Sequence, residues 1–154
     1  MSTRLKWPQL SPDGYKALLA FETYTHHAGL EKLLLDLIRL RVSQINNCAY
    51  CIDMHWKDLR AAGETEQRLS LVSVWREYPG FNDRERAALA WAESLTRIST
   101  GDVSAADFEA ARTIFTEKDL VELSLATAAI NAWNRLGVAF RPEPGRYQSP
   151  SHSV

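Results

Sequence analysis

The sequence is poor in cysteine: only two occur among 154 residues, and both lie in one short stretch, at positions 48 and 51. Small secreted domains that depend on disulfides carry several cysteine pairs, so a disulfide framework is excluded. A structural bridge between residues three apart would close too short a loop to stabilise the chain much. A chain of this length buries an ordinary core without such links.

Long apolar runs are also missing. No run of about 18 apolar residues occurs, which argues against a membrane span. Residues 1–15 contain no apolar segment of signal-peptide length. We therefore expect a cytoplasmic protein, in a compartment where thiols stay reduced unless they are catalytic or redox-sensing.

Neither sign of charge is in excess. The formal net charge is -1, with acidic and basic residues interspersed along the chain. Because nucleic-acid binding needs a clustered basic surface, we expect no nucleic-acid partner. The sequence also has no glycine-rich phosphate loop for a nucleotide, and we expect no bound cofactor.

Alternating strand patterns and internal repeats are absent as well. The sequence predicts an all-α fold, a compact bundle of six or seven helices in a single domain, with a core over about 15–141 and a tail over 142–154. The expected helices span about 12–28, 30–45, 48–63, 65–78, 83–100, 104–115 and 117–140. The candidate cap residues are Ser11, Gly63, Asn82 or Asp83, and Thr116.

The apolar side chains predict how some of these helices are placed. The last helix, 117–140, is apolar nearly all round, so we expect it in the middle of the core or at an oligomer interface. The proline- and serine-rich tail is expected to be disordered or to lie over a neighbouring subunit. Residues expected to face inward are Leu89, Ala92, Leu95 and Ile98. Trp75, Trp91 and Trp133 supply apolar surface for a core or an interface, and we favour the core for Trp91 and Trp133. Polar residues that either line a pocket or, as we favour, join neighbouring helices are Asn131, Asn134 and Arg135.

Against this background the stretch "SQINNCAYCIDMHWKDLRAAG", residues 43–63, contains reactive side chains. Cys48, Cys51 and His55 share one face of a helix, and Cys48 lies in its first turn. The positive end of the helix dipole favours an anion such as a thiolate there. His55 can exchange a proton near neutral pH. A thiolate, a proton donor and a second thiol are the parts that attack on a peroxide or a disulfide requires.

Asp36 is a candidate fourth member of this site. If the helices on either side of Asn46 and Asn47 pair antiparallel, position 36 lies within a turn of His55. Asp36 is the sole charged residue in "LLLDL", and a carboxylate in apolar surroundings needs a partner. Asp36 either orients the imidazole and accepts its proton, or lies on the solvent face of its helix.

Two other interpretations of the cysteines stay open beside the favoured redox pair. Zinc binding needs a fourth ligand, which His26, His27 or Asp36 would have to supply, because the chain has no second C-x-x-C or H-x-x-x-H pair. Alternatively, the cysteines are small buried hydrophobic residues and His55 is a core histidine. We expect no metal.

The stretch "LDLIRLRVSQINNCAYCIDMHWKDLRAAGETEQRL" resembles the core motif of the AhpD-like alkylhydroperoxidase group in the carboxymuconolactone decarboxylase superfamily. The later stretches "VSVWREYPGFNDRERAALAWAESLT" and "INAWNRLGVAFR" are similar to those that follow the motif in that group. The resemblance covers about residues 15–141. It implies an all-α fold and a homo-oligomer, a trimer or a hexamer.

The family pattern is a glutamate, eleven residues, then C-x-x-C-x-x-x-H. Here it falls on Asp36, Cys48, Cys51 and His55. The resemblance implies that Cys51 attacks a small hydroperoxide, that Cys48 resolves the sulfenic acid into a disulfide, and that His55 and Asp36 relay protons. Two positions depart from the family: Asp36 is shorter than the usual glutamate, and Tyr50 replaces a histidine that some members carry.

The leading hypothesis is therefore a cysteine-dependent hydroperoxide reductase or thiol-disulfide oxidoreductase with an antioxidant role. Its electrons would come from a protein dithiol or a lipoyl group. The alternative is a redox-sensing or adaptor protein that uses the same disulfide without significant turnover.

Overall fold

Helices supply the regular structure of residues 3–150, the part of the chain that the computed structural model describes. Within this range there are eight α-helices, one 3₁₀ helix and no strand, which confirms the all-α prediction. The elements are α1 (Trp7–Leu10), α2 (Pro12–His26), α3 (Lys32–Ile45), α4 (Ala49–Ala61), α5 (Glu66–Leu71), η1 (Val72–Val74), α6 (Asp83–Thr96), α7 (Ala105–Arg112) and α8 (Glu117–Phe140).

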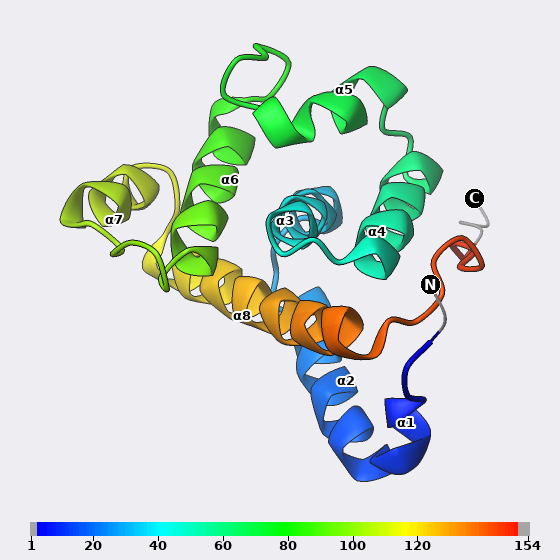
Figure 1. Ribbon diagram of the computed structural model, residues 1–154. Coiled ribbons are helices and arrows are strands. Elements are labelled where there is room, and N and C mark those ends of the chain that lie inside the picture. The colour runs from blue at the N-terminus through cyan, green and yellow to red at the C-terminus, as the bar shows by residue number, and fades with distance from the viewer. Residues whose placement is uncertain (1–2, 151–154) are drawn as a thin grey trace.

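Helix α3 lies in the middle of the molecule, surrounded by α4, α6 and α8 (Figure 1). Residues 34–43 are all buried, although they include an aspartate, two arginines and a serine. α8 instead packs along the bundle and keeps Val121 and Val138 exposed. The middle of the core, one of the two places expected for the last helix, therefore belongs to α3. An oligomer interface along α8 stays a prediction.

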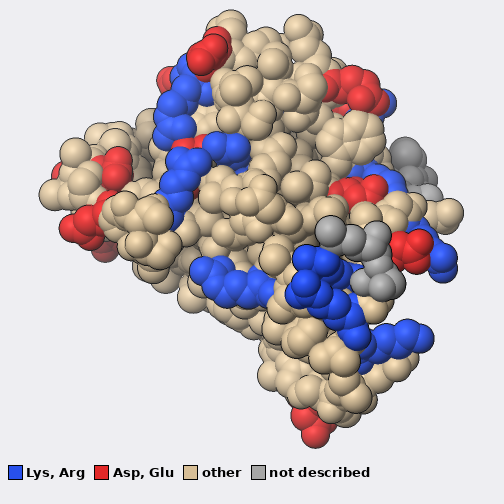
Figure 2. Space-filling view, in the orientation of Figure 1, with Lys and Arg blue, Asp and Glu red and all other residues tan. Residues whose placement is uncertain are grey.

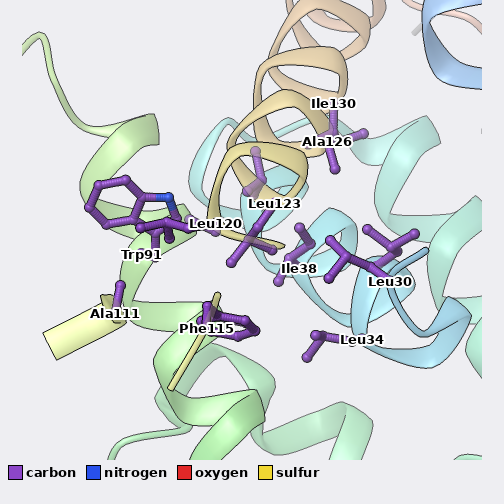
Figure 3. Packing of buried hydrophobic residues seen from close by; sticks show 14 residues of the cluster. Leu30, Leu34, Ile38, Trp91, Ala111, Phe115, Leu120, Leu123, Ala126 and Ile130 are labelled. Atoms are coloured by element: carbon purple, nitrogen blue, oxygen red, sulfur yellow. The ribbon is translucent and has the colours of Figure 1, made fainter. Parts of the chain in front are cut away.

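Two apolar clusters hold α3 in place. In the larger one, Leu34 and Ile38 of α3 meet Trp91 of α6 and Leu123 and Ile130 of α8 (Figure 3). The second cluster joins another face of α3 to α4, α5, η1 and α6, through Leu37, Leu40, Leu59, Leu69, Val72, Trp75, Phe81 and Leu89. Each fully buried side chain of this size contributes about 1.5–3 kcal/mol. Helix α3, which leads into the C-x-x-C motif, is thus fixed from both sides.

Side-chain caps mark the starts of α5, α6, α7 and α8, whereas Ser11 precedes α2 without a side-chain capping hydrogen bond. Asn82 caps α6 in a capping box with Glu85, and the Thr116 hydroxyl caps α8, both as predicted. α6 ends at Thr96, however, and Ile98 beyond it is 62% exposed, so its expected inward position is wrong.

The surface carries both signs of charge. On the face drawn in Figure 2, acidic and basic side chains stand in small groups with uncharged surface between them. No helix within residues 3–150 is both long and apolar enough to cross a membrane.

Candidate active site

The turn between α3 and α4 sets the position of the cysteines. Asn47 adopts a left-handed conformation with φ of 56°, which asparagine tolerates better than most residues. The Cys48 N–H then donates to the Ser43 carbonyl at 3.0 Å, and the Cys48 carbonyl accepts from the Ile52 N–H at 2.9 Å. The predicted break at Asn46 and Asn47 is confirmed, and Cys48 becomes the N-cap of α4.

Cys48 and Cys51 form a disulfide, with their Cα atoms 5.3 Å apart. Both are buried, but only Cys51 lines the large pocket described below. The oxidised pair has neither sulfur available as a separate thiol. Within residues 3–150, no three or more His, Cys, Asp or Glu side chains are grouped so as to hold a metal ion.

Gly137 of α8 lies directly against this disulfide. A Cβ added there would lie 2.6 Å from the Cys48 Sγ and 3.3 Å from the Cys51 Sγ, closer than the atoms can pack. Glycine therefore permits the approach of α8 to the disulfide. The sequence analysis missed this residue, and the available signal was a glycine inside an otherwise apolar helix.

Side-chain amides join α8 to the turn before α4. Asn46 Nδ2 donates to the Oδ1 atoms of Asn131 and Asn134, at 2.9 and 3.0 Å. Asn134 Nδ2 donates in turn to the Ser43 Oγ at 3.0 Å, and Arg135 donates back to the Asn131 carbonyl. The favoured joining role is confirmed for Asn131 and Asn134, which hold the turn against α8. It is wrong for Arg135, whose hydrogen bonds go to Asn131 of its own helix.

His55 lies on the same face of α4 as Cys51 and is 5% exposed. Neither ring nitrogen has a hydrogen-bond partner among the described residues. Burial, followed by the nearby charge of Arg39, lowers the pKa of His55 to about 4, despite the opposing charges of Asp36, Asp58 and Glu22. His55 is therefore a neutral imidazole at pH 7, rather than a group that titrates near neutrality as expected.

Asp36 is buried, so the solvent-face alternative is wrong. Its Oδ2 accepts from Lys32 Nζ at 2.5 Å and its Oδ1 from Arg39 Nη1 at 3.1 Å. It lines the same pocket as Cys51 and His55, but its hydrogen bonds go to cations of its own helix. A role for Asp36 in proton relay stays a prediction.

Glu22 of α2 also reaches this pocket and was missed by the sequence analysis. Its Oε1 lies 2.8 Å from Arg39 Nη2 and 3.2 Å from His26 Nε2. Burial alone would raise the pKa of Glu22, but the His26 hydrogen bond and the Arg39 charge outweigh it and lower the pKa. Its spacing from His26 on one helix face was visible in the sequence, but nothing there connected it to the C-x-x-C motif.

The pocket has a volume of about 510 Å³ and a mostly apolar wall. Trp7, Tyr15 and Trp133 form one side as a ring cluster with centroids 5.5–5.9 Å apart. Tyr50 lines it at the position where some family members carry a histidine. Such a pocket suits an apolar ligand with a small polar group at the buried end.

The tail covers part of this pocket. Lys57 Nζ donates to the carbonyls of Gly145 and Tyr147, at 3.1 and 3.0 Å. The hydroxyls of Tyr147 and Ser149 both donate to Asp58 Oδ1, at 2.8 and 2.7 Å. The expectation of disorder or of a neighbouring subunit is thus wrong for residues 142–150, which lie over α4 of their own chain. Residues 151–154 lie outside the described residues.

Comparison with known proteins agrees with this architecture. The model of the Carboxymuconolactone decarboxylase family matches residues 12–94. Uncharacterized protein YdfG of Bacillus subtilis (strain 168) is 37% identical over 139 residues, which are 90% of this chain and 95% of that protein.

Two solved structures share the fold. One is a protein of unknown function from Agrobacterium tumefaciens with a proposed AhpD role in antioxidant defence. It is 40% identical, with a TM-score of 0.91 over 95% of this chain and 100% of that one. The other is an uncharacterized peroxidase-related protein with an alkylhydroperoxidase AhpD core from Ralstonia eutropha JMP134. It is 28% identical, with a TM-score of 0.76 over 90% of this chain and 74% of that one. The chain therefore belongs to the carboxymuconolactone decarboxylase family, as an AhpD-like member.

Proposed function

We propose that this protein is a thiol-based hydroperoxide reductase in which Cys51 attacks the peroxide and Cys48 resolves the product. One observation carries the proposal: of the two bonded cysteines, only Cys51 lines the pocket that also holds His55. The names of the two similar solved proteins, an antioxidant defence protein and a peroxidase-related protein, support the same chemistry.

The reaction starts from the reduced dithiol. The Cys51 thiolate attacks one oxygen of the hydroperoxide, so that an S–O bond forms, the O–O bond breaks, and the alkoxide leaves as an alcohol once it is protonated. Cys51 becomes a sulfenic acid while the peroxide gains two electrons. Cys48 then attacks the Cys51 sulfur, the disulfide forms, and the hydroxyl group leaves as water.

His55 moves the proton in the first step. As a neutral imidazole it accepts the proton of the Cys51 thiol and returns it to the leaving alkoxide. The Asp36 carboxylate favours the transient imidazolium through its charge. A protein dithiol or a lipoyl group in its reduced, dihydrolipoyl form then reduces the disulfide and is itself oxidised to a disulfide.

The test is stopped-flow oxidation of the reduced protein by an alkyl hydroperoxide. Cys51→Ser should abolish the reaction, and Cys48→Ser should stop it at the sulfenic acid. His55→Gln should slow it by about 10²-fold. His27→Gln is the matched control, because His27 is exposed and lies outside the pocket. If the wild-type protein reacts no faster than a free peptide thiol, the proposal fails and the redox-sensing alternative gains.

A further inference from the structure

Three carboxylates line the pocket, those of Glu22, Asp36 and Asp58, and their oxygens differ in their hydrogen bonds. Asp58 Oδ1 accepts from the hydroxyls of Tyr147 and Ser149 in the tail. Both oxygens of Asp36 accept hydrogen bonds, from Lys32 and Arg39. In Glu22, Oε1 meets both of its partners, Arg39 and His26. Glu22 Oε2 is buried and has no partner among the described residues. Each Asp36 oxygen thus already accepts one hydrogen bond, whereas Glu22 keeps one buried oxygen whose acceptor sites are all free.

His55 needs a hydrogen-bond acceptor of the kind that Glu22 Oε2 can supply. Its neutral ring carries one N–H, and both nitrogens are buried without a partner among the described residues. Glu22 and His55 reach one pocket from α2 and α4, and each contributes to the electrostatic field at the other. α8 adds only Ile130, Trp133 and Gly137 to the wall. The charged and titratable groups around His55 are Tyr15, Glu22 and His26 on α2, Lys32, Asp36 and Arg39 on α3, Tyr50 and Asp58 on α4, and Tyr147 of the tail.

We propose that Glu22 is the carboxylate partner of His55, a positioning residue that accepts the imidazole N–H through one bridging water. This contact leaves the other ring nitrogen without a hydrogen, ready to take the proton of Cys51. His26 completes the connection to solvent, because it contacts Glu22 Oε1 and its side chain is 40% exposed. The inference rests on the proposed function insofar as His55 serves Cys51.

The ratio of the two His55 tautomers, read from imidazole ¹⁵N chemical shifts in the oxidised protein, tests this positioning directly. A charge-assisted hydrogen bond is about twice as strong as a neutral one, so Glu22→Gln should reduce the preference for one tautomer about tenfold. Glu31→Gln is the matched control, since Glu31 is exposed and pairs with Arg84 outside the pocket. It should leave the ratio unchanged, as should Asp36→Asn.

Arg39 retains Asp36 as a counter-ion in Glu22→Gln, which favours folding of the variant. Glu22→Asp, which keeps the charge but withdraws it by one methylene, provides a second variant and should also lower the tautomer ratio. An unchanged ratio in both Glu22 variants, or a change in Asp36→Asn alone, overturns the proposal.

The tautomer measurement needs no peroxide, so it decides the role of Glu22 even if the wild-type protein fails to reduce hydroperoxides. In an active enzyme, Glu22→Gln should also lower the rate of peroxide reduction about tenfold.

Discussion

Burial decides what the histidine at position 55 can do. The sequence pattern placed Cys48, Cys51 and His55 on one helix face and suggested that His55 titrates near pH 7. The structure places Cys48 at the N-cap of α4, bonded to Cys51, while Cys51 and His55 line the same pocket. In the structure His55 is 5% exposed and its pKa is lowered to about 4. The protonation state of His55 at pH 7 therefore follows from its burial and the neighbouring charges, and not from its being a histidine.

The stability of the protein should consequently depend on His55 in acid. The unfolded histidine titrates near pH 6.5 and the folded one near pH 4, so the unfolded state binds the proton more readily between these values. The contribution of a neutral His55 is complete above pH 6.5 and is lost as the pH falls toward 4, by at most about 1.4 kcal/mol per pH unit.

Denaturant unfolding of the oxidised protein at pH 7.5 and pH 4.5 measures this loss. His55→Gln should make the drop in unfolding free energy smaller by about 2 kcal/mol, whereas His27→Gln should not change it. Identical drops in the wild type and His55→Gln would contradict the lowered pKa.

Asp36 and Asp53 offer a second comparison between residues. Asp36 lines the pocket and its charge favours the protonated form of His55. Asp53 accepts from Lys57 and from the Gly145 N–H, at the tail. Asp36→Asn should slow peroxide reduction about tenfold, and more than Asp53→Asn does. Equal effects on the stopped-flow rate would remove Asp36 from the mechanism.

Helix α8 contacts both the turn before α4 and the disulfide. Its asparagines hold the turn before α4, and its glycine lies on the disulfide. The predicted apolar character of α8 was correct, yet it did not show that Gly137 faces Cys48. Helix α8 therefore lies directly behind the Cys48–Cys51 disulfide.

Gly137→Ala should make the disulfide easier to reduce. The added Cβ would lie 2.6 Å from the Cys48 Sγ, and the crowding affects the bonded pair more than two thiols that are free to turn apart. We expect the reduction potential to rise by about 30 mV, measured by equilibration with a dithiol buffer. Gly101→Ala is the control, because its added Cβ meets only a carbonyl oxygen at 4.0 Å. A potential that stays unchanged in Gly137→Ala would contradict the close approach.

At the scale of the whole molecule, one buried carboxylate links three elements. Glu93 of α6 accepts from Arg41 of α3 at 2.6 Å, from the Trp75 indole at 2.9 Å and from Arg76 at 2.6 Å. Burial alone would raise the pKa of Glu93, but these hydrogen bonds outweigh it and lower the pKa. The single-domain organisation and the homo-oligomer stay predictions at this scale.

Glu93→Gln should lower the free energy of unfolding by about 3 kcal/mol, because it leaves Arg41 buried without its counter-charge. Glu31→Gln breaks an ion pair that is half exposed and should cost less than about 1 kcal/mol. Urea unfolding of both variants at pH 7 provides the measurement. Similar losses in the two variants would show that Glu93 does not link the elements as described.

The sequence by itself determined the features that depend on near neighbours along the chain. Helix spacing grouped Cys48, Cys51 and His55, and the caps at Asn82 and Thr116 followed from local hydrogen bonding. The residues that surround this group were decided only by tertiary structure. Glu22 reaches the pocket and Gly137 reaches the disulfide from helices that are distant in the sequence, and residues 142–150 turn back over α4. Periodicity shows which face of a helix is buried. The packing of side chains in three dimensions determines which other helix covers that face, and therefore which charges surround His55.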